Sequence, residues 1–150
     1  MRIRNATSAD LSSVESLLSG SDLPLDGVRD NFSNFVVAED EGLVAGAIGF
    51  EQFGSVGLLR SAVVAPAHRG SGIGQRLVRQ LLARAEEAGV EDLYLLTTTA
   101  ERYFPRFGFT LTTRSAVPSA VKASAEFQGA CPDTAIVMTR RVGTAVRARA

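Results

Sequence analysis

A glycine-rich turn between a strand and a helix is the feature that most constrains how this chain can fold. The turn reads Arg69-Gly70-Ser71-Gly72-Ile73-Gly74, with an apolar stretch before it and an amphipathic stretch at 75–88 after it. Such a turn directs several backbone N–H groups and the positive end of the helix dipole toward one point. Because glycine has no Cβ, an anion can approach this backbone closely. The turn therefore predicts an anion site, and a pyrophosphate suits it well.

Two other phosphate-binding loops do not fit this sequence. A P-loop closes with Gly-Lys-Ser/Thr, whereas Gly74 is followed by Gln75 and Arg76. A dinucleotide-binding turn has the spacing G-x-G-x-x-G, and this turn has G-x-G-x-G. Glu91 and Asp92 do lie near the distance at which a ribose-binding acid is expected, so the glycine spacing alone separates the two interpretations.

The spacing Arg69-x-x-Gly72-x-Gly74 resembles the pyrophosphate loop of the GNAT N-acetyltransferases. The Val64-Ala65-Pro66 segment before it and the amphipathic helix after it resemble the same family. The resemblance implies acetyl-CoA as acyl donor, with a pyrophosphate site formed by Arg69, Gly70, Gly72 and Gly74. It also implies that backbone groups of Ala62 and Val64 pair with the pantetheine arm as an added strand would.

A row of three threonines follows the central predicted strand, at the edge where ligands collect in open α/β sheets. The family often carries an asparagine near Thr97, so the resemblance implies a hydroxyl contact from Thr97 to the pantetheine arm. The alternative is that Thr98 or Thr99 caps a following helix.

Length and composition restrict the class of protein. A chain of 150 residues predicts one domain, and 45% hydrophobic with 21% charged residues is typical of a globular protein. Sixteen basic residues balance sixteen acidic ones, so no overall field favours nucleic acid or an anionic membrane. One cysteine and one histidine leave almost no ligands for a metal. We therefore expect no metal or nucleic-acid partner. Because no apolar run of about 18 residues occurs, we also expect no membrane partner and a cytoplasmic protein.

Hydrophobic periodicity divides the chain into short strands and helices. The predicted strands are 1–5, 35–38, 43–49, 56–65, 93–96, a stretch from 109, and 135–138. The predicted helices are 7–18, 25–32, 75–88, 100–107 and 117–127. This order predicts an α/β fold similar to the GNAT fold, a mixed, mostly antiparallel sheet of six to seven strands with helices on both faces. The acetyltransferase domain is expected to span 1–140, followed by a flexible tail at 141–150.

The general acid is uncertain from sequence. The family often has Tyr-x-x-x-Gly-Phe, whose phenol protonates the leaving thiolate, but Phe104 stands at that place before Gly108-Phe109. Tyr103 is one residue earlier, about 100° round a helix, and can serve as acid only through a local irregularity; otherwise it packs. Because a thiol pKa near ~8.5 makes thiolate a tolerable leaving group, the missing phenol weakens the prediction little.

A carboxylate and a guanidinium on neighbouring strands are candidates for the acceptor side. Glu51 precedes the Phe53-Gly54 turn and is a candidate general base, or else a solvated charge. A two-residue turn there would oppose Glu51 to Val56 and leave Arg60 roughly 13 Å away, too far for an ion pair. We therefore expect Arg60, with Ser61, to bind a substrate carboxylate or oxyanion. The alternative is that Arg60 pairs with an acid elsewhere.

Longer stretches resemble a subgroup, the small N-acetyltransferases encoded with arsenic-resistance genes. They are 57–61, 95–100, 125–132 and Leu23-Pro24-Leu25. This resemblance implies detoxification, by acetylation of a small amine substrate such as the glutamate mimics arsinothricin and phosphinothricin, and the family also implies a homodimer. Two rivals are an acetyl-CoA-binding sensor without turnover and a protein or peptide N-acetyltransferase. The amine, the general base and the oligomeric state are left open.

Overall fold

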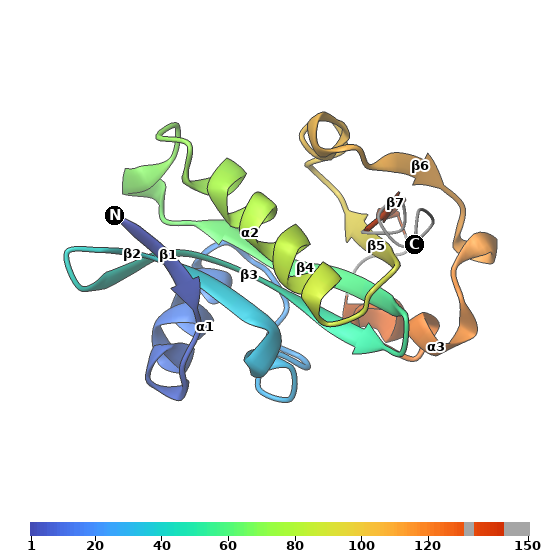
Figure 1. Cartoon of the computed structure of the whole chain (residues 1–150), viewed down its shortest axis with the longest axis horizontal. Coiled ribbons are helices and arrows are strands. Elements are labelled where there is room, and N and C mark those ends of the chain that lie inside the picture. The colour runs from blue at the N-terminus through green and yellow to red at the C-terminus, as the bar shows by residue number, and fades with distance from the viewer. Residues whose placement is uncertain (131–133, 143–150) are drawn as a thin grey trace.

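A seven-stranded mixed sheet forms the centre of the computed structural model, which describes residues 1–130 and 134–142 (Figure 1). The strand order is β1-β2-β3-β4-β5-β7-β6, with β4 and β5 parallel and every other neighbouring pair antiparallel. The strands are β1 Arg2–Asn5, β2 Phe35–Asp40, β3 Leu43–Phe53, β4 Val56–Val64, β5 Asp92–Thr97, β6 Thr110–Thr112 and β7 Ile136–Arg141. The predicted fold class is confirmed.

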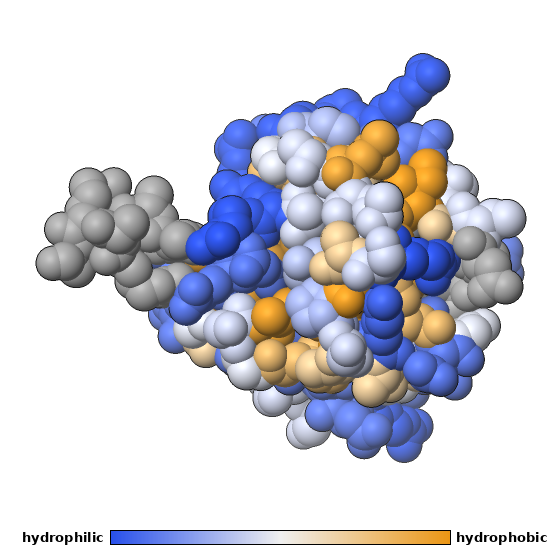
Figure 2. All heavy atoms as spheres, turned by 90° about the vertical axis from the view of Figure 1, so that its right-hand side faces the viewer, coloured by the Kyte–Doolittle hydropathy of each residue, from blue (hydrophilic) through white to orange (hydrophobic). Residues whose placement is uncertain are grey.

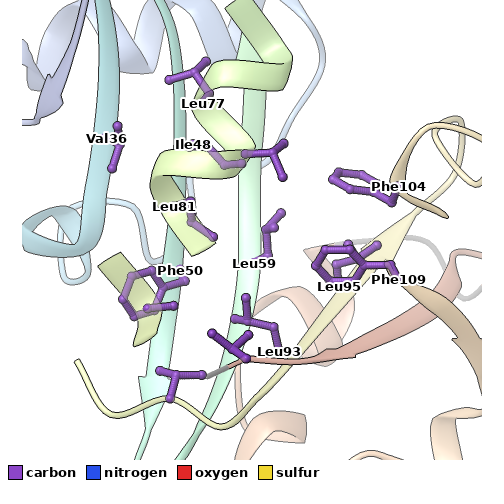
Figure 3. Packing of buried hydrophobic residues seen from close by; sticks show 14 of the residues in the cluster. Val36, Ile48, Phe50, Leu59, Leu77, Leu81, Leu93, Leu95, Phe104 and Phe109 are labelled. Atoms are coloured by element: carbon purple, nitrogen blue, oxygen red, sulfur yellow. The ribbon is translucent and has the colours of Figure 1, made fainter. Parts of the chain in front are cut away.

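Helices cover both faces of the sheet. Helix α2 (Ile73–Glu87) lies across β2 to β4 and contributes its predicted apolar stripe to the largest core cluster (Figure 1). Figure 3 shows Leu77 and Leu81 of α2 pointing toward Ile48 and Leu59 of the sheet. Each fully buried leucine of this kind contributes roughly 1.5–3 kcal/mol. This packing fixes the position of α2 on the sheet, and with it the glycine turn from which the helix begins.

The opposite face carries the two remaining helices. Helix α1 (Leu11–Gly20) buries Val14 and Leu18 in a second cluster with side chains of β2, β3 and β4. Helix α3 (Ser119–Lys122) is short and packs Val121 in a third cluster against β4 and β7. This third cluster brings a segment late in the chain beneath the centre of the sheet.

The start of the chain is held by a buried acid. Asp10 accepts a hydrogen bond from the Thr7 backbone N–H at 2.8 Å and a bidentate pair from Arg4 at 2.8 and 2.9 Å. The side chain–backbone bond is half of a capping box, as the Thr7-x-x-Asp10 spacing predicts. These contacts lower the pKa of Asp10 to about 2, and the hydrogen bonds from Arg4 have the largest effect.

Three segments differ from the predicted helices. Residues 26–31 form turns, because the φ of +81° at Gly27 lies outside the helical region, and Phe32 begins a 3-10 helix. Residues 101–107 form a turn and a 3-10 helix (Phe104–Phe107), since Pro105 lacks the N–H that a helix interior needs. Of the expected helix at 117–127, only α3 is α-helical. All three segments lie beside the site described below.

The last strand is longer than expected. β7 continues to Arg141, and Val142, two residues beyond the expected domain end at residue 140, is buried in the main core. The domain bounds stay a prediction. Residues 143–150 of the expected tail, and Cys131, lie outside the described residues.

Strand β6 forms one edge of the sheet, with Leu111 69% exposed. Figure 2 shows this side of the molecule, where hydrophobic side chains gather in several small groups between polar ones. The expected homodimer stays a prediction.

Candidate active site

The site opens where the two parallel strands separate. β4 pairs with β5 only as far as Leu59, opposite Leu95, although both strands continue. The cause lies in β4, where Ser61 has a φ of +62° and the β3–β4 register shifts, so that two residues face one. Such a bulge bends a strand away from its neighbour. A cavity of about 650 Å³ lies between the separated strands, within the range of small-molecule sites.

The glycine turn forms one end of this cavity. Gly70 and Gly72 each have a φ of +84°, and a Cβ at either would meet no atom within 4 Å. Helix α2 begins at Ile73, so the amide N–H groups of its first turn have no intrahelical acceptor. The Arg69 Nε donates to the Val64 carbonyl at 3.1 Å, which keeps this guanidinium at the rim. Open space, free donors and a cation together fit a pyrophosphate.

All seven residues predicted to bind acetyl-CoA line this one cavity. They are Ala62, Val64, Arg69, Gly70, Gly72, Gly74 and Thr97. No helix follows directly for Thr98 or Thr99 to cap, and the Thr97 Oγ1 accepts a hydrogen bond from the Ala100 N–H at 2.8 Å. The Thr97 hydroxyl keeps its own proton for donation into the cavity. The contact of each residue with the cofactor stays a prediction.

Tyr103 and Phe104 both border the cavity, but only Tyr103 brings a hydroxyl to it. Because the segment is a turn and not an α-helix, the Tyr103 ring lies over the start of α2, with its Oη 2.9 Å from where a Cβ on Gly74 would stand. Phe104 is buried in the main core, as Figure 3 shows. Burial raises the pKa of the Tyr103 phenol, opposed by the charge of Arg106, which lies over its ring. The phenol stands at the cofactor end. Val64, which approaches the same Gly74 position, lies three residues along β4 from the bulge at Ser61.

A buried ion cluster forms the other end. The Arg60 side chain is 0% exposed; its Nη1 donates to the Glu51 Oε2 at 2.7 Å, and its Nη2 lies 3.5 Å from the Glu126 Oε2. Its Nε donates to the Ser61 Oγ at 3.0 Å. The Ser124 hydroxyl donates to the same Glu51 oxygen at 3.0 Å. The cluster thus joins β3, β4 and the segment after α3.

The expected 13 Å between Glu51 and Arg60 is wrong. The turn is Gly54-Ser55, so Phe53 opposes Val56 and Glu51 opposes Leu58. Arg60 is then only two residues further along the same face, within diagonal reach. In this register Arg60 does have protein partners, so the reason given for expecting a substrate anion there is wrong. The structure shows the alternative, in which Arg60 pairs with acids of the protein.

Arg60, Ser61 and Glu126 line the cavity, whereas Glu51 stands behind Arg60 and is not part of the wall. Sequence reasoning missed Glu126 as a site residue. Glu126 follows the small residues 123–125 and lies within the stretch 125–132 that carries the subgroup resemblance, which gave it no role of its own. The loop after α1 closes this end, with Asp22, Leu23 and Pro24 in the wall. The Pro24 carbonyl accepts from the Arg60 Nη2 at 3.4 Å. The roles of Arg60 and Ser61 in substrate binding, and of Glu51 as base, stay predictions.

Other polar groups do not gather into a further centre. His68 pairs with Asp40 at 3.0 Å and ties the β2–β3 hairpin to the loop before the glycine turn. Across residues 1–130 and 134–142, no three His, Cys, Asp or Glu side chains are arranged to hold a metal ion. None of the helices in these ranges is both long and apolar enough to span a membrane.

Comparison with known proteins identifies the family of the chain. Residues 31–111 match the family profile described as "Acetyltransferase (GNAT) domain". An amino-acid acetyltransferase of Ralstonia nicotianae is 30% identical over 77% of this chain and 28% of its own length. One from Actinobacillus pleuropneumoniae is 29% identical over 64% of this chain and 22% of its own. The chain therefore spans less than a third of the length of these curated relatives.

Solved structures show the same fold. N-acetylglutamate synthase from Neisseria gonorrhoeae, complexed with coenzyme A and N-acetyl-glutamate, superposes with a TM-score of 0.81 at 22% identity, covering 94% of this chain and 35% of that one. Rv2747 from Mycobacterium tuberculosis, in complex with CoA, gives 0.81 at 22% identity over 95% of this chain and 99% of that chain. The profile match covers more than half of the residues, and the predicted family is confirmed: the chain belongs to the GNAT acetyltransferase family.

Proposed function

We propose that the protein is an acetyl-CoA-dependent N-acetyltransferase that acts on the amine of a small, amino-acid-like acceptor. The observation that carries the proposal is one cavity with two chemically different ends. One end offers backbone N–H groups and an arginine for a pyrophosphate, and the other a buried cluster of carboxylates and a guanidinium. A donor lying along β4 would bring its thioester from the first end toward the second.

The cofactor end supports binding of acetyl-CoA in an extended form. Among the described residues, β4 has no strand partner on the β5 side beyond Leu59, so backbone groups of Ala62 and Val64 can pair with the pantetheine arm. The glycine turn then receives the pyrophosphate, with Arg69 adding a positive charge. These contacts hold the reactants in position, which is the largest part of catalysis for a direct transfer.

The reaction needs no covalent enzyme intermediate. The acceptor amine loses one proton and attacks the thioester carbon; the C–N bond forms and the C–S bond breaks. The second proton of the amine nitrogen goes to the departing sulfur, so the products are an amide, a thiol and one proton released. We propose that Tyr103 contacts the donor near Gly74 and supplies or relays that proton to sulfur as general acid. A thiol pKa of about 8.5 keeps the demand on any acid small.

An acceptor carrying both an amine and a carboxylate matches the second end. The curated relatives are amino-acid acetyltransferases, and one similar structure contains N-acetyl-glutamate. Arg60 holds Glu51 at 2.7 Å but Glu126 only at 3.5 Å, so a substrate carboxylate can displace the longer contact and keep the shorter. Glutamate, or a toxic glutamate mimic such as arsinothricin or phosphinothricin, fits this description. Acetylation would remove the positive charge by which such a mimic resembles glutamate.

The proposal is tested by thiol release from acetyl-CoA with a panel of amines. The panel contains glutamate, phosphinothricin, arsinothricin, a polyamine and a lysine peptide. We expect release with the amino acids and little with the last two. Release with the peptide alone would point to a peptide N-acetyltransferase. Acetyl-CoA binding without release from any amine would contradict catalysis and favour a sensor, the rival that Phe104 at the usual tyrosine position supports.

A further inference from the structure

We propose that Glu126 is the carboxylate that receives the acceptor amine and takes its proton, while Glu51 acts only through Arg60. The proposal rests on the function proposed above and assigns the two ends of an amino-acid substrate within its site. Glu126 would hold the ammonium and Arg60 the neighbouring carboxylate. The buried pair Arg60–Glu126 then has the two charges that a zwitterionic acceptor complements.

Position in the cavity separates the two glutamates. Glu126 is only 5% exposed, and what remains open faces the cavity, because it belongs to the wall together with Arg60, Ser61 and Leu23. Glu51 stands on the far side of the guanidinium. Its Oε2 already accepts from the Arg60 Nη1 at 2.7 Å and from the Ser124 hydroxyl at 3.0 Å. A general base must reach the proton it takes, and among these two carboxylates only Glu126 borders the space where an amine would lie.

The contacts around Glu51 suit a positioning role. Glu51 fixes one edge of the Arg60 fork, and Gly27 approaches the same group so closely that a Cβ there would stand 2.8 Å from the Arg60 Nη1. The other edge of the fork faces Glu126 at 3.5 Å. Arg60 is therefore held from behind and can exchange Glu126 for a substrate carboxylate. In that exchange the ammonium of the acceptor takes the place of Arg60 against the Glu126 carboxylate.

The proton balance follows from this arrangement. The acceptor enters as an ammonium, and its first proton moves to the Glu126 carboxylate, which leaves a neutral amine to attack the thioester. Breakdown expels the thiolate, and the second proton passes from nitrogen to sulfur. Glu126 then returns its proton to solvent. Of the charged groups near Glu126, Arg60 contacts it, Glu51 lies behind Arg60, and Asp22 lies in the same wall. Arg114 lies over the ring of the next residue, Phe127.

The test compares Glu126→Gln and Glu51→Gln by steady-state kinetics from pH 6 to pH 10, with phosphinothricin and glutamate as acceptors. We expect Glu126→Gln to lower kcat at pH 7 by about a hundredfold or more, the usual effect of removing a general base. Its rate should then rise about tenfold per pH unit, because the free amine has to form in solution, whereas the wild type levels off. Glu51→Gln should lower kcat less and keep the wild-type pH profile. Glu87→Gln, at an exposed acid near the end of α2, should change nothing.

Two further measurements keep the result clear. Acetyl-CoA should raise the Tm of every variant as it does for the wild type, which separates loss of a base from loss of folding. Glu126→Asp, which keeps a carboxylate, should recover the wild-type shape of the pH profile at a lower kcat. A wild-type profile in Glu126→Gln, or the sloping profile in Glu51→Gln, would overturn the assignment. A wild-type enzyme that acetylates neither acceptor would overturn the proposed function and this assignment with it.

Discussion

The two ends of the cavity are built in different ways. The cofactor end comes from one continuous stretch, β4, the glycine turn and α2, and its key positions face open space. The acceptor end joins β3, β4, the loop after α1 and the segment after α3, and its charges are buried. A ligand site made of backbone N–H groups needs only local geometry. A site made of buried charges needs partners brought from distant parts of the chain.

The largest effect on stability is expected from a substitution that breaks the ion cluster at the acceptor end. Arg60→Leu leaves Glu51 and Glu126 buried without their shared cation, which should lower the free energy of unfolding by about 3–5 kcal/mol. Urea denaturation measures this loss. The double variant Arg60→Leu/Glu51→Leu should be less destabilised than the sum of the two single changes, since one of the two carboxylates that lose Arg60 is removed as well. Additive effects would mean that the pair is not coupled.

A change at the cofactor end should cost less stability than the loss of Arg60 and should remove binding. Gly72→Glu places a carboxylate where the pyrophosphate is proposed to lie, so acetyl-CoA should no longer raise the Tm. At a hundred times the Kd the wild type should gain about 2.7 kcal/mol from the ligand. Gly89→Glu is the matched control, because Gly89 has a φ of +88°, equally open surroundings and a place at the other end of α2. Equal ligand shifts in both variants would contradict the location of the site.

A smaller effect is expected away from both ends. Asp10 has a pKa of about 2, lowered chiefly by Arg4, so its contribution to stability is present above the unfolded value near 3.8 and is lost as the pH falls toward 2. Because Arg4 is 22% exposed, solvent screens the pair, and Asp10→Asn should cost only about 1 kcal/mol at pH 7. The difference in urea midpoint between wild type and variant should therefore be largest at pH 7 and clearly smaller at pH 2.5. A difference of the same size at both pH values would contradict this origin.

The smallest effect concerns the phenol. Tyr103→Phe should reduce kcat by less than about tenfold, because the thiolate is already a fair leaving group. Burial raises the pKa of Tyr103, so any loss of rate from its ionisation should begin at a higher pH than for an exposed tyrosine. Tyr94→Phe on β5 serves as the matched removal of a hydroxyl. A loss of a hundredfold or more in Tyr103→Phe alone would make the phenol an essential acid.

The difference between a cofactor end built from one stretch of chain and an acceptor end built from several also explains what the sequence could predict. The strand–glycine turn–helix unit and Arg69 are contiguous, so their spacing predicted a site whose residues all line the cavity. The position of Glu51 depended on the turn after β3, and placing that turn one residue early put Arg60 out of reach. Glu126 is joined to Arg60 only through the packing of α3 beneath the sheet, a contact with no local pattern. Tyr103 enters the cavity because Pro105 prevents a regular helix, which changes the direction of the ring.

The most direct test of the account is mass spectrometry of the products formed from acetyl-CoA and phosphinothricin or glutamate by the wild type and by Gly72→Glu. The account predicts an amino acid carrying one acetyl group on its α-nitrogen with the wild type, and none above background with the variant. An acetylated product formed equally by both proteins would contradict a donor site at the glycine turn. Absence of any acetylated amino acid with the wild type, while acetyl-CoA still raises its Tm, would contradict the proposed acceptor.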